Sequence, residues 1–363
     1  MKATAAVCRV QGEPLSIEAI DVREPQHAEV RVQIEFCAIC HSDITYAEGG
    51  WGGQVPAIYG HEASGVVESV GIGVTDLNVG DRVVVGLLRS CGGCYHCVRN
   101  EDHLCRGQFP DDTPFRDDNG LPIVRGLNTG AFASATVVHR SQVALIPDDV
   151  PSDAASLLAC GVLTGYGSVI TTADMAEGAT VAVIGLGGVG LSALQAAVDR
   201  KASRLIAVDI LDSKLEVARR YGADILVNAR TENPVLAARE ATGGIGPDYV
   251  FVTAGSAPAI EQGLAMLRRG GTIVMVGMPP TGMFTELEIS NVSDAGQTIL
   301  GSKMGSGSFA RDLPLLIERF RAGALDLASM VSNVYPIEEI NEAIAEVNAG
   351  SVVRNVIEMP TAQ

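Results

Sequence analysis

Basic residues are scarce in this chain of 363 residues. Lys and Arg number 26 against 43 Asp and Glu, which gives a formal net charge of −17 at pH 7. A chain this acidic repels the phosphate backbone of nucleic acids and the surface of anionic lipids. We therefore expect neither nucleic acid nor a membrane among its partners.

The sequence also lacks a secretory signal and a convincing membrane span. Arg9 interrupts an apolar N-terminal stretch that is too short for a signal peptide. Residues 178–198 carry no charge, but four glycines lie in the middle of this run. A strand, a glycine turn and the start of a helix explain the run better than one helix in lipid. We expect a cytoplasmic protein.

The composition is globular, and the length suits about two domains. The first part of the chain is rich in short β segments separated by Gly, Pro and Asp, and we interpret it as an irregular, mostly β module. Its strand-like segments are residues 30–36, 63–71, 81–88 and 135–140.

From Leu158 onward, β segments alternate with stretches that have helical spacing. The strand-like segments are residues 180–185, 204–210, 224–228, 248–255, 271–277 and 298–303. This alternation predicts an α/β unit with a doubly wound parallel sheet. Two helices, 310–322 and 337–349, and a last strand, 351–359, should rejoin the first module. The predicted domains are therefore residues 1–157 with 296–363, and residues 158–295.

The strongest chemical signal is a run of four cysteines within residues 91–105. Tetrahedral Zn²⁺ takes four thiolates, and the tight spacing lets one loop wrap the ion. We interpret the run as a closed, structural zinc site, with an iron–sulfur cluster as the lesser alternative. His96 and His103 lie inside the loop, but four cysteines already fill the coordination shell. The four are Cys91, Cys94, Cys97 and Cys105.

A second candidate metal site is dispersed along the chain. Cys40 lies in CHSD, His61 and Glu62 in YGHE, and Cys160 in LLACGV. Three ligands of mixed sulfur and nitrogen character leave a fourth position open for water or substrate, which is typical of a catalytic zinc. Cys37 and Cys40 also form a C-x-x-C that could be a redox pair or half of a metal site. We interpret Cys37 as an ordinary buried thiol.

The glycine-rich segment GLGGVG, residues 185–190, follows a strand and precedes a helix. Its glycines permit a tight turn and let backbone N–H groups meet a pyrophosphate at the helix N-terminus. Asp209 closes the next strand about 20 residues later, where a carboxylate binds the adenine ribose hydroxyls. A carboxylate there repels a 2′-phosphate, so the pattern favours NAD over NADP.

Together, GHE, the four-cysteine loop, GLGGVG and the C-terminal VVRNVI resemble the zinc-dependent alcohol dehydrogenases of the medium-chain dehydrogenase/reductase superfamily. The resemblance covers nearly the whole chain. It implies a GroES-like, mostly β catalytic domain and a Rossmann domain, with two zinc ions per chain and NAD. The implied reaction is reversible hydride transfer between a small-molecule alcohol and NAD, giving an aldehyde or ketone. A homodimer or homotetramer is the implied assembly.

The resemblance also implies individual roles. Cys40, His61 and Cys160 would bind the catalytic zinc, Glu62 could exchange onto the metal, Asp43 would orient His61, and Ser42 would hold the substrate hydroxyl. The implied cofactor-binding residues are Gly185, Gly187, Gly188, Val189, Gly190, Asp209, Lys214, Thr164, His41, Val276 and Arg354. Trp51, Leu87 and Phe132 would line the substrate cleft, although each could equally be core.

The sequence departs from the family at Thr45, where many relatives carry a surface histidine that ends a proton relay from Ser42. The relay could run through His41, through water, or less efficiently.

Other functions stay open from the sequence. The enzyme could retain its NAD and pass electrons to another acceptor, or act on glutathione adducts or formaldehyde. A catalytically inactive binding or structural protein and a zinc-free quinone or enoyl reductase are disfavoured, because both cysteine-containing ligand sets are intact.

Overall fold

The structure is a computed structural model that describes residues 1–110 and 112–360. Residues 111 and 361–363, which the predicted domain division included, lie outside the described residues. The chain forms two compact units. The first unit contains residues 1–160, 308–320 and 326–363, and the second contains 161–307 and 321–325. The second unit thus continues past the predicted boundary at residue 296, to residue 307, and includes residues 321–325.

Two β-sheets form the first unit. The five-stranded sheet has the order β1 (Lys2–Val7), β2 (Ser16–Val22), β7 (Phe115–Arg116), β8 (Pro122–Arg125) and β4 (Ala57–Ile58). The larger sheet has the order β10 (Val143–Leu145), β6 (Arg82–Val85), β5 (Glu62–Val70), β3 (Glu29–Ala38), β18 (Arg354–Glu358) and β17 (Val331–Pro336), and β9 (Ala135–His139) pairs with β3. The α-helices that begin in this unit are α1 (His41–Ala47), α2 (Ser152–Ser156), α9 (Phe309–Arg321) and α10 (Ile340–Ala349).

Strand β3 pairs with β5 and β9 and also with the C-terminal strand β18. Val30, Val32 and Ile34 lie on one face of this strand and are at most 1% exposed. The C-terminal strand β18 pairs antiparallel with β3, and Ile357 lies opposite Cys37. The C-terminal strand therefore rejoins the N-terminal module at this position.

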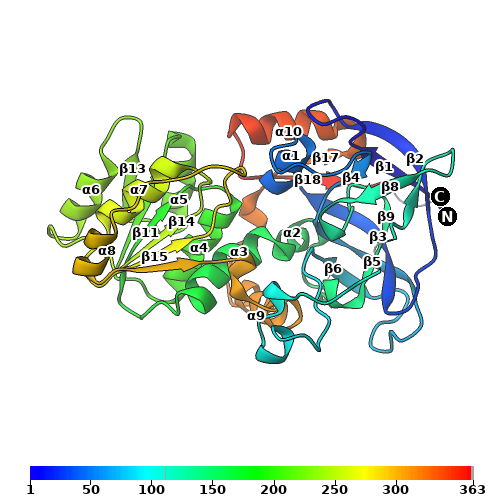
Figure 1. Ribbon diagram of the computed structural model, residues 1–363, viewed down its shortest axis with the longest axis horizontal. Helices are drawn as coiled ribbons and strands as arrows, with labels where there is room; N and C mark the ends of the chain where they lie inside the picture. The colour runs from blue at the N-terminus through cyan, green and yellow to red at the C-terminus, as the bar shows by residue number, and fades with distance from the viewer. Residues whose placement is uncertain (111, 361–363) are drawn as a thin grey trace. The chain divides into compact units, whose positions relative to one another are not determined.

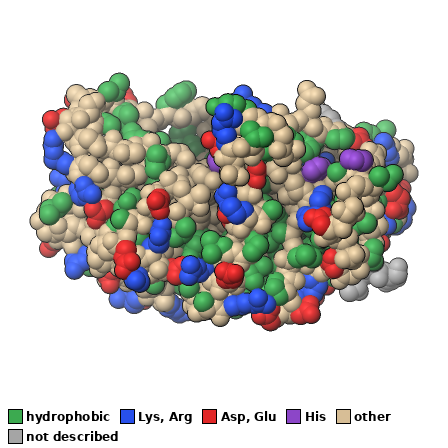
Figure 2. Space-filling view, turned by 90° about the horizontal axis from the view of Figure 1, so that it is seen from below, with side chains coloured by type: hydrophobic (Ala, Val, Ile, Leu, Met, Phe, Trp, Pro, Cys, Tyr) green, Lys and Arg blue, Asp and Glu red, His purple; other side chains and the backbone are tan. Residues whose placement is uncertain are grey.

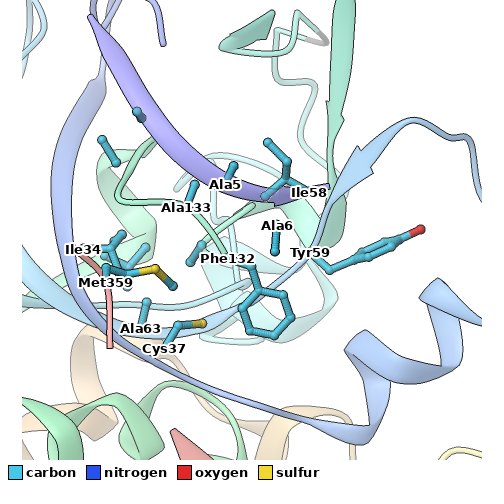
Figure 3. Close-up of a cluster of buried hydrophobic side chains, with 14 of the residues drawn as sticks. Ala5, Ala6, Ile34, Cys37, Ile58, Tyr59, Ala63, Phe132, Ala133 and Met359 are labelled. Atoms are coloured by element: carbon cyan, nitrogen blue, oxygen red, sulfur yellow. The ribbon is translucent and has the colours of Figure 1, made fainter. Parts of the chain in front are cut away.

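The hydrophobic core of the first unit gathers residues that are far apart in the sequence. Figure 3 shows Phe132 beside Cys37 and Ala63, with Tyr59 nearby. Phe132 is 1% exposed and Cys37 is fully buried. The thiol of Cys37 thus has the apolar setting of an ordinary core cysteine.

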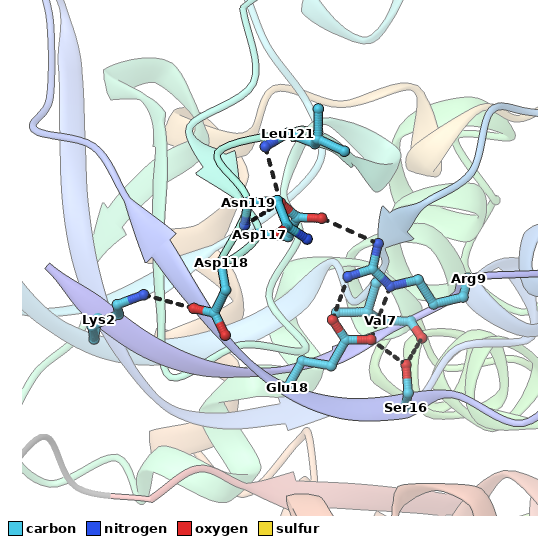
Figure 4. A network of polar contacts seen from close by, with 9 residues as sticks. All are labelled: Lys2, Val7, Arg9, Ser16, Glu18, Asp117, Asp118, Asn119 and Leu121. Atoms are coloured by element: carbon cyan, nitrogen blue, oxygen red, sulfur yellow. Dashed lines mark hydrogen bonds and ion pairs between the residues drawn. The ribbon is translucent and has the colours of Figure 1, made fainter.

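A polar network on the first unit connects the β1–β2 hairpin to the turn after β7 (Figure 4). Arg9 Nε donates to Glu18 Oε1 at 2.9 Å, and its Nη1 lies 3.6 Å from Asp117 Oδ2. Lys2 Nζ donates to Asp118 Oδ1 at 2.8 Å. Exposed ion pairs contribute little individually, so we regard this network as fixing the turn rather than driving folding.

The second unit is built on the doubly wound parallel sheet that the sequence predicts (Figure 1). The strand order is β13 (Ile225–Asn228), β12 (Arg204–Asp209), β11 (Thr180–Ile184), β14 (Tyr249–Val252), β15 (Thr272–Met275) and β16 (Thr298–Gly301). Its α-helices are α3 (Gly161–Gly167), α4 (Gly188–Asp199), α5 (Asp212–Arg220), α6 (Pro234–Ala241), α7 (Ala257–Met266) and α8 (Ile289–Ala295).

Side chains on one face of this sheet pack against two of its helices. Ala182, Ile206 and Val250 share a core cluster with Ala238 of α6 and Met266 of α7. Because the strands are buried, they are almost continuously apolar, as in parallel sheets covered by helices.

Within the described ranges, no single helix is long and apolar enough to cross a membrane, although the bent pair 152–159 and 161–172 reaches those limits together. Figure 2 shows one face of the molecule, on which acidic and basic side chains are interspersed.

Candidate functional site

The dispersed metal-site candidates converge in the first unit. Cys40 lies between β3 and α1, His61 and Glu62 lie at the start of β5, and Cys160 follows a short 3-10 turn. One ligand atom from each of these four residues lies within 4.8 Å of the other three. His61 and Glu62 are fully buried, and Cys160 is 7% exposed. The fold thus brings together residues that are up to 120 positions apart, from Cys40 to Cys160.

Asp43 fixes the orientation of His61. Its Oδ1 lies 2.9 Å from His61 Nδ1 and accepts the backbone N–H of Gly60 at 2.8 Å, while Oδ2 accepts the N–H of Cys40 at 3.1 Å. A proton on Nδ1 leaves Nε2 with a lone pair, and Nε2 is buried without a hydrogen-bond partner. A buried nitrogen beside two thiols and a carboxylate suits a zinc ion.

The two thiols do not titrate alike. A hydrogen bond from Cys160, together with nearby His61, lowers the pKa of Cys40 well below its usual value. The same contact with Cys40 and burial raise the pKa of Cys160. The pair therefore favours one thiolate, the form of cysteine that binds metals.

Glu62 forms an ion pair with Arg354 of β18. Glu62 Oε2 lies 2.6 Å from Arg354 Nη2, and both side chains are nearly or fully buried. Burial raises the pKa of Glu62 to about 7 although Arg354 opposes the shift. Burial alone would lower the pKa of Arg354, but Glu62 and Cys40 raise it. A charged Arg354 thus balances negative charge at this site.

The candidates for the proton relay lie on α1, which starts immediately after Cys40. His41 is exposed and Ser42 is half-buried. Thr45 Oγ1 donates to the backbone carbonyl of His41 at 2.8 Å, one helical turn earlier. The Thr45 hydroxyl proton is therefore held within the helix.

The three residues expected in a substrate cleft have different surroundings. Trp51 and Leu87 are partly exposed, and the Trp51 ring meets Tyr46 edge-on at 5.2 Å. Phe132 lies in the hydrophobic core (Figure 3). This is the core placement that the sequence left open for Phe132.

The four-cysteine loop closes on itself. The sulfur atoms of Cys91, Cys94, Cys97 and Cys105 lie within 4.8 Å of one another. Backbone hydrogen bonds lower the pKa of Cys94 to about 6. A Cβ on Gly107 would lie 2.6 Å from Cys91 Sγ, so only glycine fits beside the cluster. His96 pairs with Glu101 at 2.8 Å instead of joining the sulfurs.

The glycine segment in the second unit forms the expected turn between β11 and α4. Gly185 has φ +92°, and a Cβ on Gly190 would lie 1.9 Å from the carbonyl oxygen of Gly185. A Cβ on Gly187, in contrast, would meet nothing within 4 Å. The space at Gly187 therefore suits a ligand approaching the N-terminus of α4.

Asp209 lies at the end of β12, and backbone amides hold its carboxylate. Oδ2 accepts the N–H of Leu186 at 2.7 Å, and Oδ1 accepts those of Ile210 and Leu211. These bonds connect the carboxylate to the glycine turn and fix its position.

The remaining cofactor candidates are divided between the units. Thr164, Val189, Lys214 and Val276 belong to the second unit, with Thr164 and Val276 nearly buried, whereas His41 and Arg354 belong to the first. A Cβ on Gly165 would lie 2.1 Å from the carbonyl oxygen of Val189, so the backbones of α3 and α4 are in close contact.

Sequence reasoning missed two supporting contacts. It assigned Glu62 and Arg354 to separate roles and did not anticipate their ion pair. It also missed Thr253, whose Oγ1 donates to the carbonyl of Gly185 at 2.6 Å and supports the glycine turn. No local pattern signals either contact, because each joins segments that are distant in the sequence.

Two protein-family models match the chain. The alcohol dehydrogenase GroES-like domain matches residues 26–148, and the zinc-binding dehydrogenase model matches residues 188–322. Alcohol dehydrogenase 1 of Pisum sativum is 35% identical over 99% of this chain and 97% of its own length.

Solved structures agree with these matches. The alcohol dehydrogenase zinc-binding domain protein from Burkholderia ambifaria has a TM-score of 0.95 at 33% identity, covering 99% of both chains. Benzyl alcohol dehydrogenase from Acinetobacter calcoaceticus has a TM-score of 0.93 at 31% identity, covering 99% of this chain and all of its own.

Proposed function

Because the chain belongs to the zinc-dependent alcohol dehydrogenases of the medium-chain dehydrogenase/reductase superfamily, we propose that Cys40, His61 and Cys160 bind its catalytic zinc. The protein is an oxidoreductase that interconverts small-molecule alcohols and carbonyl compounds with zinc and NAD(P). The observation that carries the site assignment is the buried Nε2 of His61, which has no hydrogen-bond partner and lies beside two thiols.

Zinc bound there would act as a Lewis acid on the alcohol oxygen, and the nicotinamide would accept hydride. Asp43 keeps the proton on His61 Nδ1, so that Nε2 stays available as a ligand. Glu62 could approach the metal if it left Arg354. While the two side chains stay paired, Arg354 balances the negative charge of Glu62.

Ser42 is the proposed acceptor for the substrate hydroxyl proton. Its place on α1, two residues after Cys40, supports this role. Thr45 is a poor last member of a relay because its hydroxyl donates to the carbonyl of His41. The exposed imidazole of His41 is the better route to solvent, since a histidine can accept and release a proton near neutral pH.

We assign NAD, rather than NADP, to the second unit. The carboxylate of Asp209 is held at the end of β12, and a fixed negative charge there disfavours a 2′-phosphate. Lys214, Thr164, Val189 and Val276 are the further proposed cofactor contacts in this unit.

The four-cysteine loop is assigned a structural zinc. Four sulfurs fill a tetrahedral shell and leave no open position for a substrate. The cysteines of both metal sites form no disulfide, which suits a reducing compartment such as the cytoplasm.

The assembly we propose is a homodimer or homotetramer. Strand β16 is the last strand in the sheet order, and the neighbouring segment exposes Met278, Phe284 and Ile289 by 67%, 87% and 72%. Exposed apolar side chains of this size are typical of a contact surface. A monomeric mass from light scattering at micromolar concentration would contradict this assignment.

A substrate panel followed at the NADH absorbance tests the function, on protein whose zinc content has been measured. We expect about two zinc ions per chain, activity with NAD over NADP, and turnover of aliphatic or benzyl alcohols. NADH that cannot be separated from the protein would indicate a retained cofactor, and activity restricted to glutathione adducts would indicate the formaldehyde-type alternative.

Ser42→Ala at full zinc content should lower kcat, and an unchanged kcat would remove Ser42 from the relay.

A further inference from the structure

An unusual turn follows the last strand of the second unit. Met304, Gly305 and Ser306 have φ values of 51°, 69° and 54°, so three consecutive residues adopt the left-handed conformation. Two of them are not glycine, and such residues store backbone strain that the surrounding structure must offset. Strain of this kind is concentrated at functional sites, which directs attention to what the turn contacts.

Several contacts within the second unit hold the turn in place. Thr172 Oγ1 lies 2.8 Å from Ser302 Oγ and 2.9 Å from Ser306 Oγ, so one hydroxyl connects both ends. A Cβ on Gly305 would lie 2.5 Å from the carbonyl oxygen of Leu163, and one on Gly167 would lie 2.8 Å from Gly305 Cα. The turn is therefore packed directly on the backbone of α3.

This packing brings Met304 to Thr164 in the middle of α3. Thr164 Oγ1 donates to Met304 Sδ at 3.5 Å, and both residues are nearly buried, at 8% and 9% exposure. A threonine in a helix usually divides between two rotamers, because its hydroxyl can bond a carbonyl of the preceding turn. The hydrogen bond to sulfur selects one rotamer and thereby fixes where the Thr164 methyl group lies.

We propose that Met304 is a positioning residue for the nicotinamide: its thioether sulfur holds the Thr164 hydroxyl, and the strained turn places that sulfur. The inference rests on the proposed role of Thr164 in packing the nicotinamide ring. Met304 itself acts through Thr164.

Ligand binding to matched variants of the full-length protein tests this proposal. Met304→Leu keeps the volume but removes the acceptor, Thr164→Val removes the donor, and Met304→Gln restores an acceptor. Met175→Leu is the control, because Met175 is a buried methionine of the same unit at 1% exposure. Affinities for NADH and for ADP-ribose, which lacks the nicotinamide, are measured by fluorescence titration and calorimetry.

We expect Met304→Leu and Thr164→Val each to weaken NADH binding by about 2- to 10-fold, the effect of one neutral hydrogen bond. ADP-ribose binding should be unchanged. The double variant Met304→Leu/Thr164→Val should bind NADH no more weakly than either single variant. Met304→Gln should recover most of the lost NADH affinity.

Other results would overturn the inference. NADH affinity of Met304→Leu equal to that of Met175→Leu, equal losses for NADH and ADP-ribose, or additive losses in the double variant would each reduce Met304 to a packing residue. If the wild-type protein bound ADP-ribose and NADH with the same affinity, Thr164 would have no nicotinamide to position. Absence of all NAD(H) binding by the wild type would instead contradict the proposed function itself.

Discussion

Replacing Asp43 by asparagine removes a negative charge at the proposed catalytic metal site and keeps the size of the side chain. Asp43 is 2% exposed, and its carboxylate serves His61, Gly60 and Cys40. In Asp43→Asn, Oδ1 can still accept from His61 and Gly60, but the new amide N–H₂ then faces the N–H of Cys40. Reversing the amide would repair that contact and break the other two.

The magnitude follows from these contacts. One buried N–H loses its acceptor, which costs about 1–3 kcal/mol, and the bond from His61 loses its ionic partner. Losing such a partner of a ligating histidine typically weakens metal binding by about 10- to 100-fold. We therefore expect the variant to lose its catalytic zinc first when it is titrated with a chelator, falling from about two to about one zinc per chain.

The assay is zinc content against chelator concentration, with kcat measured in parallel. Asp117→Asn is the matched control, because Asp117 is also buried, at 6% exposure, and accepts the backbone amides of Asn119 and Leu121 far from the metal-site residues in sequence. If Asp43→Asn held both zinc ions as tightly as this control and kept its kcat, His61 would not depend on Asp43, and the orienting role assigned to Asp43 would be refuted.

Three further variants address the other parts of the chain. Gly187→Ala should leave the unfolding temperature unchanged, because its Cβ meets nothing within 4 Å, but weaken NADH binding at least about 10-fold by filling pyrophosphate space; normal binding in a titration would place the cofactor elsewhere. Cys94→Ser should lower zinc content by about one per chain and lower the unfolding temperature, and full zinc content would argue against the structural site. Burial alone would raise the pKa of Asp248, but Thr180 and Arg268 lower it. The contribution of Asp248 to stability is thus present above its unfolded pKa of about 3.9 and is lost as pH falls further. Denaturant titrations should show a smaller loss below about pH 4 in Asp248→Asn, and identical pH profiles would contradict this assignment.

Local patterns in the sequence were sufficient wherever function depends on close spacing. The cysteines of residues 91–105 and the glycines of residues 185–190 each lie within one short segment, so their spacing already limits the geometry. The six strands of the second unit were also readable, because buried parallel strands are continuously apolar. In the first unit, short strands such as β4 and β7, with two residues each, carry too little pattern to be recognised.

The sequence by itself determined which metal-ligand types are present and where the glycine turn lies. It also determined the two architectures, a mostly β module and an α/β unit with a parallel sheet. Only the tertiary structure decided which distant residues meet: Cys40 with Cys160, Glu62 with Arg354, and Thr164 with Met304. It also placed Phe132 in the hydrophobic core. The physical reason is that spacing constrains neighbours along a chain, whereas contacts between distant residues are selected by the packing of whole sheets and helices.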